Sequence, residues 1–268
     1  MLSVKKDENF NLKATLECGQ VFRYKINGGR YTVFSKDKMM VIEENESSYT
    51  LVEGEEAFFL KYFDFDRNYD IICSNIADDF VSDAMRFSRG IRLLNQDPAE
   101  MVFSFIISQN NHIPRIKAII ERLCDALGED KGGYKAFPTV EALASKDADF
   151  YHKAGLGYRA EYIASAARSL CGEDFNKLSG MNTPELRNYL MLLKGVGRKV
   201  ADCILLFGFS RREVFPVDTW IMKVFSDIYG NISADKLACL LSERYGEKSG
   251  YIQQWLFYKK RETEKRFG

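Results

Sequence analysis

The part of the sequence with the clearest chemical potential runs from residue 193 to residue 220 and contains a lysine on an apolar helix face. Cys203 and Phe207 follow Lys199 at i+4 and i+8, so the three side chains share one face of a predicted helix. A lysine in such a place either extends its ammonium group to water or keeps it in a partly desolvated pocket. In a pocket we expect the pKa of the amine to fall, which would make Lys199 a nucleophile.

Asp218 comes directly before another predicted helix, in the run Pro-Val-Asp-Thr-Trp. An aspartate at this position commonly caps the helix that follows. A carboxylate beside an apolar pocket can also stabilise positive charge on a sugar carbon as a base leaves. Only one helix and one return loop separate Lys199 from Asp218, so we expect both groups at one site, where the aspartate can serve both purposes.

Gly195 and Gly197 separate two predicted helices, over residues 184–193 and 198–207. The second helix would begin with free backbone N–H groups, and the glycines remove side chains that would obstruct them. Such a helix start suits a phosphate of a nucleic-acid backbone. A Gly-x-Gly between helices is also often only a turn, so the phosphate interpretation depends on the lysine and the aspartate nearby.

Two kinds of periodicity divide the chain. Polar and apolar residues alternate over residues 10–54, as they do in β-strands. An Asn-Gly-Gly turn separates two predicted strands, 21–26 and 30–34. Further strands are predicted at 39–43 and 49–52, and residues 11–16 are expected to form the strand that enters the sheet. Beyond residue 54 the apolar period is helical. We therefore predict an α+β fold, in which an N-terminal antiparallel β-sheet domain with flanking helices (1–95) packs on a larger all-helical body (96–268). The helices are expected at 79–94, 98–108, 113–127, 140–145, 159–171, 184–193, 198–207, 219–229, 234–245 and 251–260.

Composition excludes several classes of protein. The chain has 268 residues, of which 46% are hydrophobic, enough to fill a large core, but no apolar run approaches the about 18 residues that span a bilayer. Six cysteines are scattered singly and only two histidines accompany them, so we expect no metal site and no disulfide framework. No export signal is visible, which favours the cytoplasm or nucleoid, or the nucleus of a eukaryote, and we expect a monomer without a membrane partner.

The block Gly195-Val196-Gly197-x-Lys199 followed by Asp218 resembles the catalytic signature of the helix-hairpin-helix DNA glycosylases, specifically the 8-oxoguanine DNA glycosylase family. The resemblance extends across nearly the whole chain. It implies that Lys199 attacks the sugar C1′ and forms a Schiff base, with Asp218 as its acidic partner. It also implies that the hairpin glycines contact DNA.

Two other segments resemble the parts of this family that hold the damaged base. In the Gly-Gln-Val-Phe-Arg segment, Gly19 matches the glycine whose carbonyl accepts the N7 hydrogen that 8-oxoguanine has and guanine lacks. Gln253 and Phe257 match a glutamine for the Watson-Crick edge and an aromatic ring for the face of the base. Cys203 would lie on its opposite side. Without the resemblance, such a glutamine is ordinary at a surface and such a phenylalanine in a core.

Two segments resemble the parts that act on the strand opposite the lesion. Asn110 matches the asparagine that fills the gap left by the extruded base, and Tyr158 matches a wedge beside the orphaned base. Unstacking a base costs a few kcal/mol, which such contacts offset. Arg115 and Arg159 would donate hydrogen bonds to the acceptors of cytosine. Each arginine alone is equally compatible with a phosphate contact or a surface salt bridge.

The resemblance therefore implies a base excision repair enzyme that flips 8-oxoguanine, opposite cytosine, out of double-stranded DNA. It would be an 8-oxoguanine DNA N-glycosylase with DNA-(apurinic or apyrimidinic site) lyase activity, and it would need no metal or organic cofactor. Trp220 departs from the histidine that members often carry two residues after the aspartate. The cysteine spacing of the endonuclease III branch is absent, so no iron-sulfur cluster is expected.

Two alternatives are compatible with the residues alone. A glycosylase for another damaged or mismatched base would not need Gly19, Gln253 and Phe257 to meet in one pocket. A non-catalytic helix-hairpin-helix DNA-binding protein would use only the hairpin and would leave Lys199 and Asp218 unexplained. The arrangement of these side chains in space therefore distinguishes the three possibilities.

Overall fold

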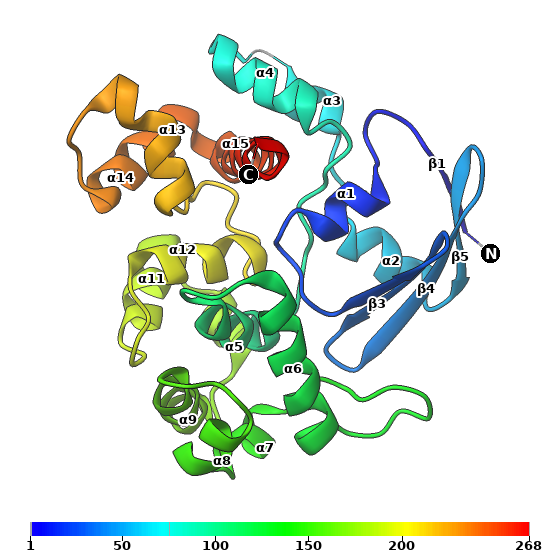
Figure 1. Cartoon of the computed structure of the whole chain (residues 1–268), viewed down its shortest axis with the longest axis vertical. Helices are drawn as coiled ribbons and strands as arrows, with labels where there is room; N and C mark the ends of the chain where they lie inside the picture. The colour runs from blue at the N-terminus through cyan, green and yellow to red at the C-terminus, as the bar shows by residue number, and fades with distance from the viewer. Residues whose placement is uncertain (1, 75, 268) are drawn as a thin grey trace.

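A five-stranded antiparallel sheet forms one side of the molecule (Figure 1). The computed structural model describes the backbone of residues 2–74 and 76–267 and the side chains of the same residues as far as residue 264. The strand order is β1-β5-β4-β3-β2. The strands are β1 (Ser3–Lys5), β2 (Tyr24–Asn27), β3 (Arg30–Ser35), β4 (Lys38–Glu44) and β5 (Ser48–Glu53).

The predicted Asn-Gly-Gly hairpin is present between β2 and β3. Asn27 pairs with Arg30, and the two glycines between them, Gly28 and Gly29, have φ angles of 52° and 85°. Glycine adopts this left-handed region without steric cost, and tight hairpin turns require it. On the covered face of the sheet, strand side chains pack into a core with helices α1 (Leu12–Glu17) and α2 (Glu56–Tyr62).

Residues 11–16 were expected to be a strand, and this prediction is wrong. Leu12–Glu17 forms helix α1, because the side chain of Asn11 accepts a hydrogen bond from the backbone N–H of Ala14 (2.9 Å) and caps the helix. Leu12 and Leu16, one helical turn apart, are both fully buried against the sheet. Over so short a stretch, apolar residues at alternate positions fit both the two-residue period of a strand and the 3.6-residue period of a helix.

Helices form most of the remaining described chain. Residues 79–94 were predicted as one helix, but helix α4 covers only Asp79–Phe87, and a turn at 88–90 and irregular chain follow it. Gly90 (φ +87°) packs so closely on α1 that a Cβ there would lie 2.8 Å from the Asn11 backbone nitrogen. The helices are α2 (Glu56–Tyr62), α3 (Tyr69–Cys73), α4 (Asp79–Phe87), α5 (Pro98–Ser108), α6 (Ile113–Leu127), α7 (Val140–Ala144), α8 (Ala148–Lys153), α9 (Arg159–Leu170), α10 (Phe175–Ser179), α11 (Thr183–Met191), α12 (Arg198–Phe207), α13 (Thr219–Tyr229), α14 (Ala234–Tyr245) and α15 (Ser249–Phe267).

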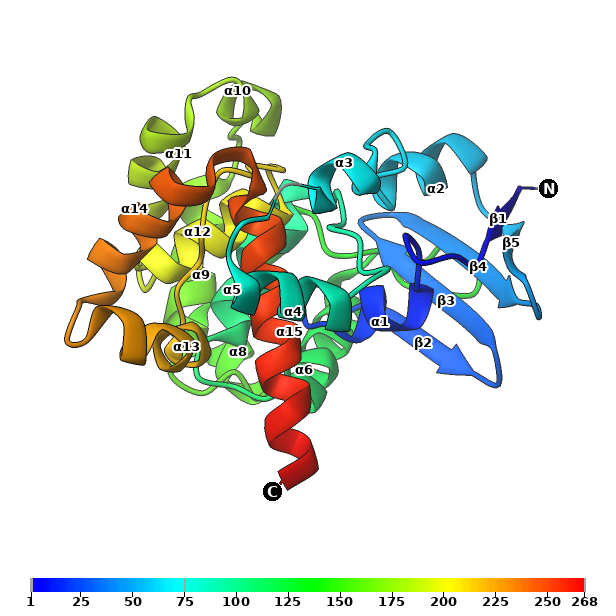
Figure 2. The ribbon, with the colours of Figure 1, turned by 90° about the horizontal axis from the view of Figure 1, so that it is seen from above.

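Helix α15 occupies the junction between the sheet side and the helical body. It packs against α4, α13 and α14, and Figure 2 shows it running between the α13–α14 pair and α1. The fold is therefore α+β, as predicted from the change of periodicity. Because α15 touches both sides, its side chains can reach both the N-terminal segment and helix α12.

A buried ion pair also joins the two sides. Arg23, between α1 and β2, lies 3.6 Å from the carboxylate of Glu100 on α5, and both side chains are almost completely buried. Burial raises the pKa of Glu100 to about 7, although Arg23 opposes this shift. A titratable group thus lies where the sheet side meets the helical body.

Candidate active site

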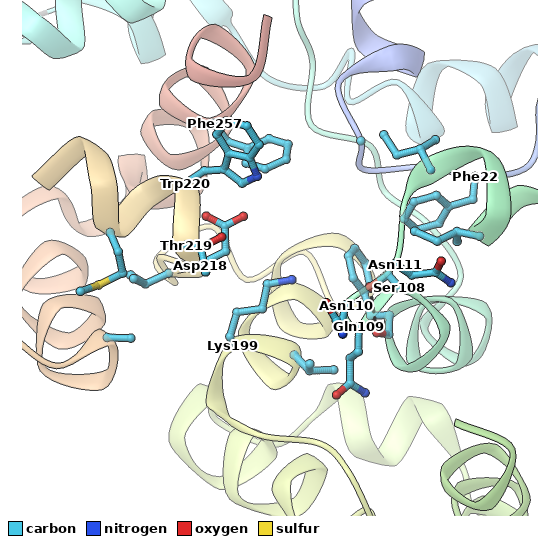
Figure 3. Close-up of a pocket in the computed structure, with 18 of the residues that line it drawn as sticks. Phe22, Ser108, Gln109, Asn110, Asn111, Lys199, Asp218, Thr219, Trp220 and Phe257 are labelled. Carbon is cyan, nitrogen blue, oxygen red and sulfur yellow. Dashed lines mark hydrogen bonds between the residues drawn. The ribbon is translucent and has the colours of Figure 1, made fainter. Parts of the chain in front are cut away.

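A cleft of about 760 Å³ opens between α12, the start of α13, the turn between α5 and α6, and α15 (Figure 3). A smaller cavity of about 60 Å³ adjoins it, and the two share Gly19, Phe105, Lys199, Asp218 and Phe257. All six residues predicted to act in catalysis or base binding line the smaller cavity. They are Gly19, Lys199, Cys203, Asp218, Gln253 and Phe257.

Lys199 lies on the first turn of α12, a helix whose residues 200–207 are all buried. Figure 3 shows its amine pointing into the space between Asp218 and the turn that carries Asn110. The helix starts at the glycine hairpin, so the hairpin fixes where this amine enters the cleft.

The sequence led us to expect a lowered pKa for Lys199, but the structure indicates the opposite. Cys203 and then Asp218 raise the pKa of the amine, and burial only partly offsets them. Burial raises the pKa of the Cys203 thiol to about 11, so the charge of Cys203 acts on Lys199 only at high pH, and at neutral pH the negative group beside the amine is Asp218. The raised pKa means that Lys199 is an ammonium in the free protein at neutral pH.

Asp218 caps helix α13, the first of the two roles that its position suggested. Its Oδ1 atom accepts a hydrogen bond from the backbone N–H of Ile221 (2.9 Å), which caps α13. Oδ2 has no hydrogen-bond donor among the described residues, and the side chain lines both cavities. The cap holds the carboxylate beside Lys199 and leaves one oxygen available to the cleft.

The backbone around Gly19 is held so that one carbonyl stays free. Gly19 has φ +94°, and a Cβ there would lie 2.9 Å from Arg261 and 3.4 Å from the ring of Phe257. Its own carbonyl accepts no hydrogen bond within the described part of the chain. The carbonyls of residues 17, 18 and 20 each accept one from a side chain, respectively that of Arg261 (2.6 Å), Gln254 (3.0 Å) and Gln96 (2.8 Å).

Gln253 and Phe257 lie one turn apart on α15 and both face the smaller cavity. Gln253 is only 6% exposed, and its Oε1 atom is buried without a hydrogen-bond partner among the side chains and backbone that the structure describes. A buried acceptor left unpaired costs about 1–3 kcal/mol. A bound molecule that places an N–H donor at Oε1 would remove that cost, so the cavity is suited to a ligand with such a donor.

Asn110 lies in the turn between α5 and α6, and its side chain lines the larger cleft. Its φ is +45°, a left-handed conformation that non-glycine residues seldom adopt. Arg159 holds this turn by donating to the carbonyls of Asn110 (2.8 Å) and Gln109 (2.8 Å). Tyr158, 49% exposed, also lines the cleft, and the guanidinium of Arg159 lies 4.4 Å from the centre of its ring.

The two arginines expected to meet the opposite base differ in their surroundings. Arg159 is only 3% exposed and donates to backbone carbonyls, so in this conformation it supports the turn instead of facing outward. Arg115 is exposed, and its Nη2 atom donates to the Gly155 carbonyl at 3.3 Å. Their contact with an opposite cytosine stays a prediction. Sequence spacing gave no signal of the support that Arg159 provides.

The glycine hairpin is fixed by side chains that the sequence did not single out. Gly195 has φ +82°, and a Cβ there would lie 2.3 Å from the ring of Tyr162. Gly197 precedes α12 in open space. Asp202 is only 1% exposed, and its Oδ1 atom accepts a hydrogen bond from Nε of Arg187 on α11 (2.6 Å). This ion pair between a half-buried arginine and a buried aspartate joins the two hairpin helices and thereby positions Lys199.

Trp220 lies on the first turn of α13 and also lines the cleft (Figure 3). Lys223 places its ammonium 5.2 Å from the centre of a tryptophan ring, a cation–π contact. The tryptophan therefore offers an aromatic surface at the rim, close to the capping carboxylate of Asp218.

Two family models match the chain and together span it almost to α15. Residues 2–102 match the N-terminal domain of 8-oxoguanine DNA glycosylase, and residues 103–245 match the HhH-GPD superfamily base excision DNA repair protein. The chain belongs to the 8-oxoguanine DNA glycosylase family. This confirms the resemblance first seen in the hairpin, the lysine and the aspartate.

Relatives agree with this assignment. A probable N-glycosylase/DNA lyase of Methanothermobacter thermautotrophicus is 33% identical over 235 residues, which cover 78% of this chain and 74% of the relative. The N-glycosylase/DNA lyase of Saccharomyces cerevisiae is 28% identical over 96% of this chain and 85% of its own length. The Clostridium acetobutylicum 8-oxoguanine glycosylase/lyase, solved with double-stranded DNA containing cytosine opposite 8-oxoG, superimposes with a TM-score of 0.89, at 33% identity over 98% of this chain and 99% of that one.

Proposed function

We propose that this chain is a bifunctional DNA glycosylase and AP lyase that excises 8-oxoguanine from duplex DNA. The observation that carries the proposal is one cavity lined by Lys199, Asp218, Gly19 and Gln253, in which the Gly19 carbonyl and Oε1 of Gln253 have no hydrogen-bond partner among the described residues. The relatives named N-glycosylase/DNA lyase, and the Clostridium acetobutylicum glycosylase/lyase, support the same chemistry. A protein that used only its hairpin would have no use for these four groups together.

Recognition of the lesion follows from the hydrogen-bonding groups of the cavity. The Gly19 carbonyl is an acceptor, so it attracts the N7–H of 8-oxoguanine and repels the N7 lone pair of guanine. Oε1 of Gln253 would accept from an N–H of the Watson-Crick edge, which satisfies a buried acceptor at the same time. Phe257 would cover one face of the base and Cys203 the other. Rejection of a base that lacks the donor is strong where buried polar groups would stay unpaired.

The reaction uses Lys199 as the nucleophile. Its ammonium first loses a proton, and the amine then attacks C1′ as the bond to the base nitrogen breaks and the base leaves with the electron pair. Asp218 would stabilise the positive charge that develops on the sugar. The lysine nitrogen, now bonded to C1′, loses a proton, and its lone pair forms the C=N bond of the Schiff base as O4′ leaves C1′, takes up a proton and the sugar ring opens. Removal of a proton from C2′ then expels the 3′ phosphate by β-elimination.

The remaining predicted residues would hold the distorted duplex. Asn110 fills the space of the flipped base, and Tyr158 wedges beside its partner. Arg115 and Arg159 would donate to cytosine, which needs Arg159 to leave part of its backbone contacts. A phosphate would bind at the start of α12, beside Gly197. We propose that the protein is a monomer and acts in the nucleoid or nucleus, where the DNA is. We place the boundary between its N-terminal sheet domain and its helical domain between residues 95 and 96.

Single-turnover excision of 8-oxoguanine, paired in turn with each of the four bases, tests this function. We expect release from every lesion duplex, fastest opposite cytosine, and no release of guanine. Duplexes with an alkylated purine or a mismatch serve as controls. Release of those bases in place of 8-oxoguanine would identify a glycosylase of another specificity, and release of no base would leave only DNA binding.

A further inference from the structure

Arg261 lies one turn beyond Phe257 on α15 and connects the two groups proposed to recognise the lesion. Its Nη2 atom donates to the Glu17 carbonyl at 2.6 Å, two residues before Gly19. Its guanidinium lies 5.6 Å from the ring centre of Phe257, and its Nη1 atom would be 2.9 Å from a Cβ on Gly19. The arginine therefore contacts both the backbone that presents the Gly19 carbonyl and the ring that covers the base.

The other contacts of Arg261 place it behind the cavity. It does not line either cavity and is 8% exposed. It also lies 5.6 Å from the ring centre of Tyr258 and bonds to Glu262 at 3.0 Å. With these neighbours in place, a base in the cavity would meet Gly19 and Phe257, and the arginine would act through them.

We propose that Arg261 is a positioning residue that sets discrimination for 8-oxoguanine by fixing Gly19 and Phe257 relative to each other. Gln254 holds the Cys18 carbonyl at 3.0 Å, which restrains one peptide next to Gly19. Arg261 supplies the second restraint, on the Glu17 carbonyl. Without it the peptide around Gly19 could rotate, because glycine populates both signs of φ.

The geometry favours a role in recognition over a role in stability alone. The Nη1 atom of Arg261 is buried without a hydrogen-bond partner among the residues that the structure describes. An unpaired buried donor lowers stability, so the guanidinium gains less for the fold than its contacts suggest. A methionine would keep the packing on Phe257 and would remove both the hydrogen bond to Glu17 and the unpaired donor. We therefore expect Arg261→Met to leave the melting temperature within a few degrees of the parent.

The proposal rests on the proposed excision of 8-oxoguanine, and three variants test it. Arg261→Met removes the donor, and Arg261→Lys keeps a charge and a donor without the planar stacking group. Arg211→Met is the matched control, because Arg211 also holds backbone carbonyls, those of Ser179 (2.7 Å) and Met181 (2.8 Å), but lines neither cavity. Each is assayed for single-turnover excision of 8-oxoguanine opposite cytosine and for cleavage of a preformed abasic site.

We expect Arg261→Met to slow excision by about 10-fold to 100-fold, since a displacement of about 1 Å has effects of that size. Cleavage of a preformed abasic site should stay within about twofold, because that step needs Lys199 but no base in the cavity. Arg261→Lys should recover part of the excision rate, and Arg211→Met should retain all of it. Equal losses of both activities, or an unchanged excision rate, would overturn the proposal. If the parent protein cleaves abasic sites but releases no 8-oxoguanine, the proposed function fails, independently of Arg261.

Discussion

Lys199 must be a free amine to attack carbon, yet its surroundings hold it as an ammonium. Ionised Cys203 raises its pKa, burial opposes this shift, and Asp218 adds to it; because the thiol is neutral below about pH 11, Asp218 is the charge that acts near neutral pH. Below that raised pKa the fraction of free amine grows tenfold with each pH unit, so we expect excision to become faster as pH rises. Single-turnover rates from about pH 6 to about pH 9 measure this rise.

Asp218→Asn gives the control for this pH profile. The substitution removes one of the causes that raise the pKa of Lys199, so the rise of the excision rate with pH should begin at a lower pH. The maximum rate should also fall, because a neutral amide in place of the carboxylate carries no charge to stabilise the sugar cation. A rate independent of pH in the parent, or a profile moved to higher pH in the variant, would contradict this account of the amine.

Gln253 and Gln254 are adjacent and both buried, but they differ in whether the side chain has a hydrogen-bond partner. Gln254 donates to the Cys18 carbonyl, whereas Oε1 of Gln253 has no partner within the described residues. Gln253→Ala should therefore leave thermal stability nearly unchanged and slow excision about 10-fold or more. Gln254→Ala should lower the free energy of unfolding by about 1–3 kcal/mol. Thermal melts with parallel excision assays compare them, and a large loss of stability in Gln253→Ala would mean that it supports the fold.

At the scale of elements, the hairpin contains two glycines that serve different purposes. Gly195 cannot carry a Cβ, because its φ is +82° and Tyr162 occupies the space. Gly197 has room for one. We expect Gly195→Ala to destabilise the protein by about 1–3 kcal/mol, which thermal unfolding would measure.

Gly197→Ala should fold like the parent and bind DNA more weakly, because a methyl group at the start of α12 would obstruct an approaching phosphate. Salt-dependent binding to an undamaged duplex measures this effect. Unchanged DNA affinity in Gly197→Ala would argue against a phosphate at this helix start.

Most elements could be predicted because their signals are local. Pro98 after a capping aspartate marked the start of α5, and the Asn-Gly-Gly turn predicted the β2–β3 hairpin. Helix α1 was mistaken for a strand because six residues fit both periods. The end of α4 depended on the close contact between Gly90 and α1, which lies far away in the sequence.

The site residues were predictable as a set, but their surroundings were not. The family's motifs marked Lys199, Asp218 and Gln253, which meet in one cavity. The raised pKa of Lys199 depends on the distances to Cys203 and Asp218, which periodicity does not give. The carbonyl bonds of Arg159 and Arg261 depend in the same way on chain segments brought together by folding.

At the scale of the whole molecule, Glu100 makes the junction between the sheet side and the helical body sensitive to pH. Burial raises its pKa from 4.5 to about 7. The folded state therefore holds a proton that the unfolded state releases, so this group favours folding at low pH and loses that contribution as pH rises through about 7. Denaturant unfolding of the parent and Glu100→Gln from about pH 5 to about pH 8 tests this. The stability of the parent relative to the variant should fall over that range, and a constant difference would contradict the assignment.

The central claim is that Lys199 forms the covalent bond to the sugar, and borohydride trapping on an 8-oxoguanine duplex tests it most directly. Reduction of the Schiff base should give a stable protein–DNA adduct, and peptide mapping by mass spectrometry should place it on Lys199. Lys199→Gln should bind the lesion duplex and give no adduct. An adduct on another lysine, or trapping that survives in Lys199→Gln, would contradict the proposed mechanism.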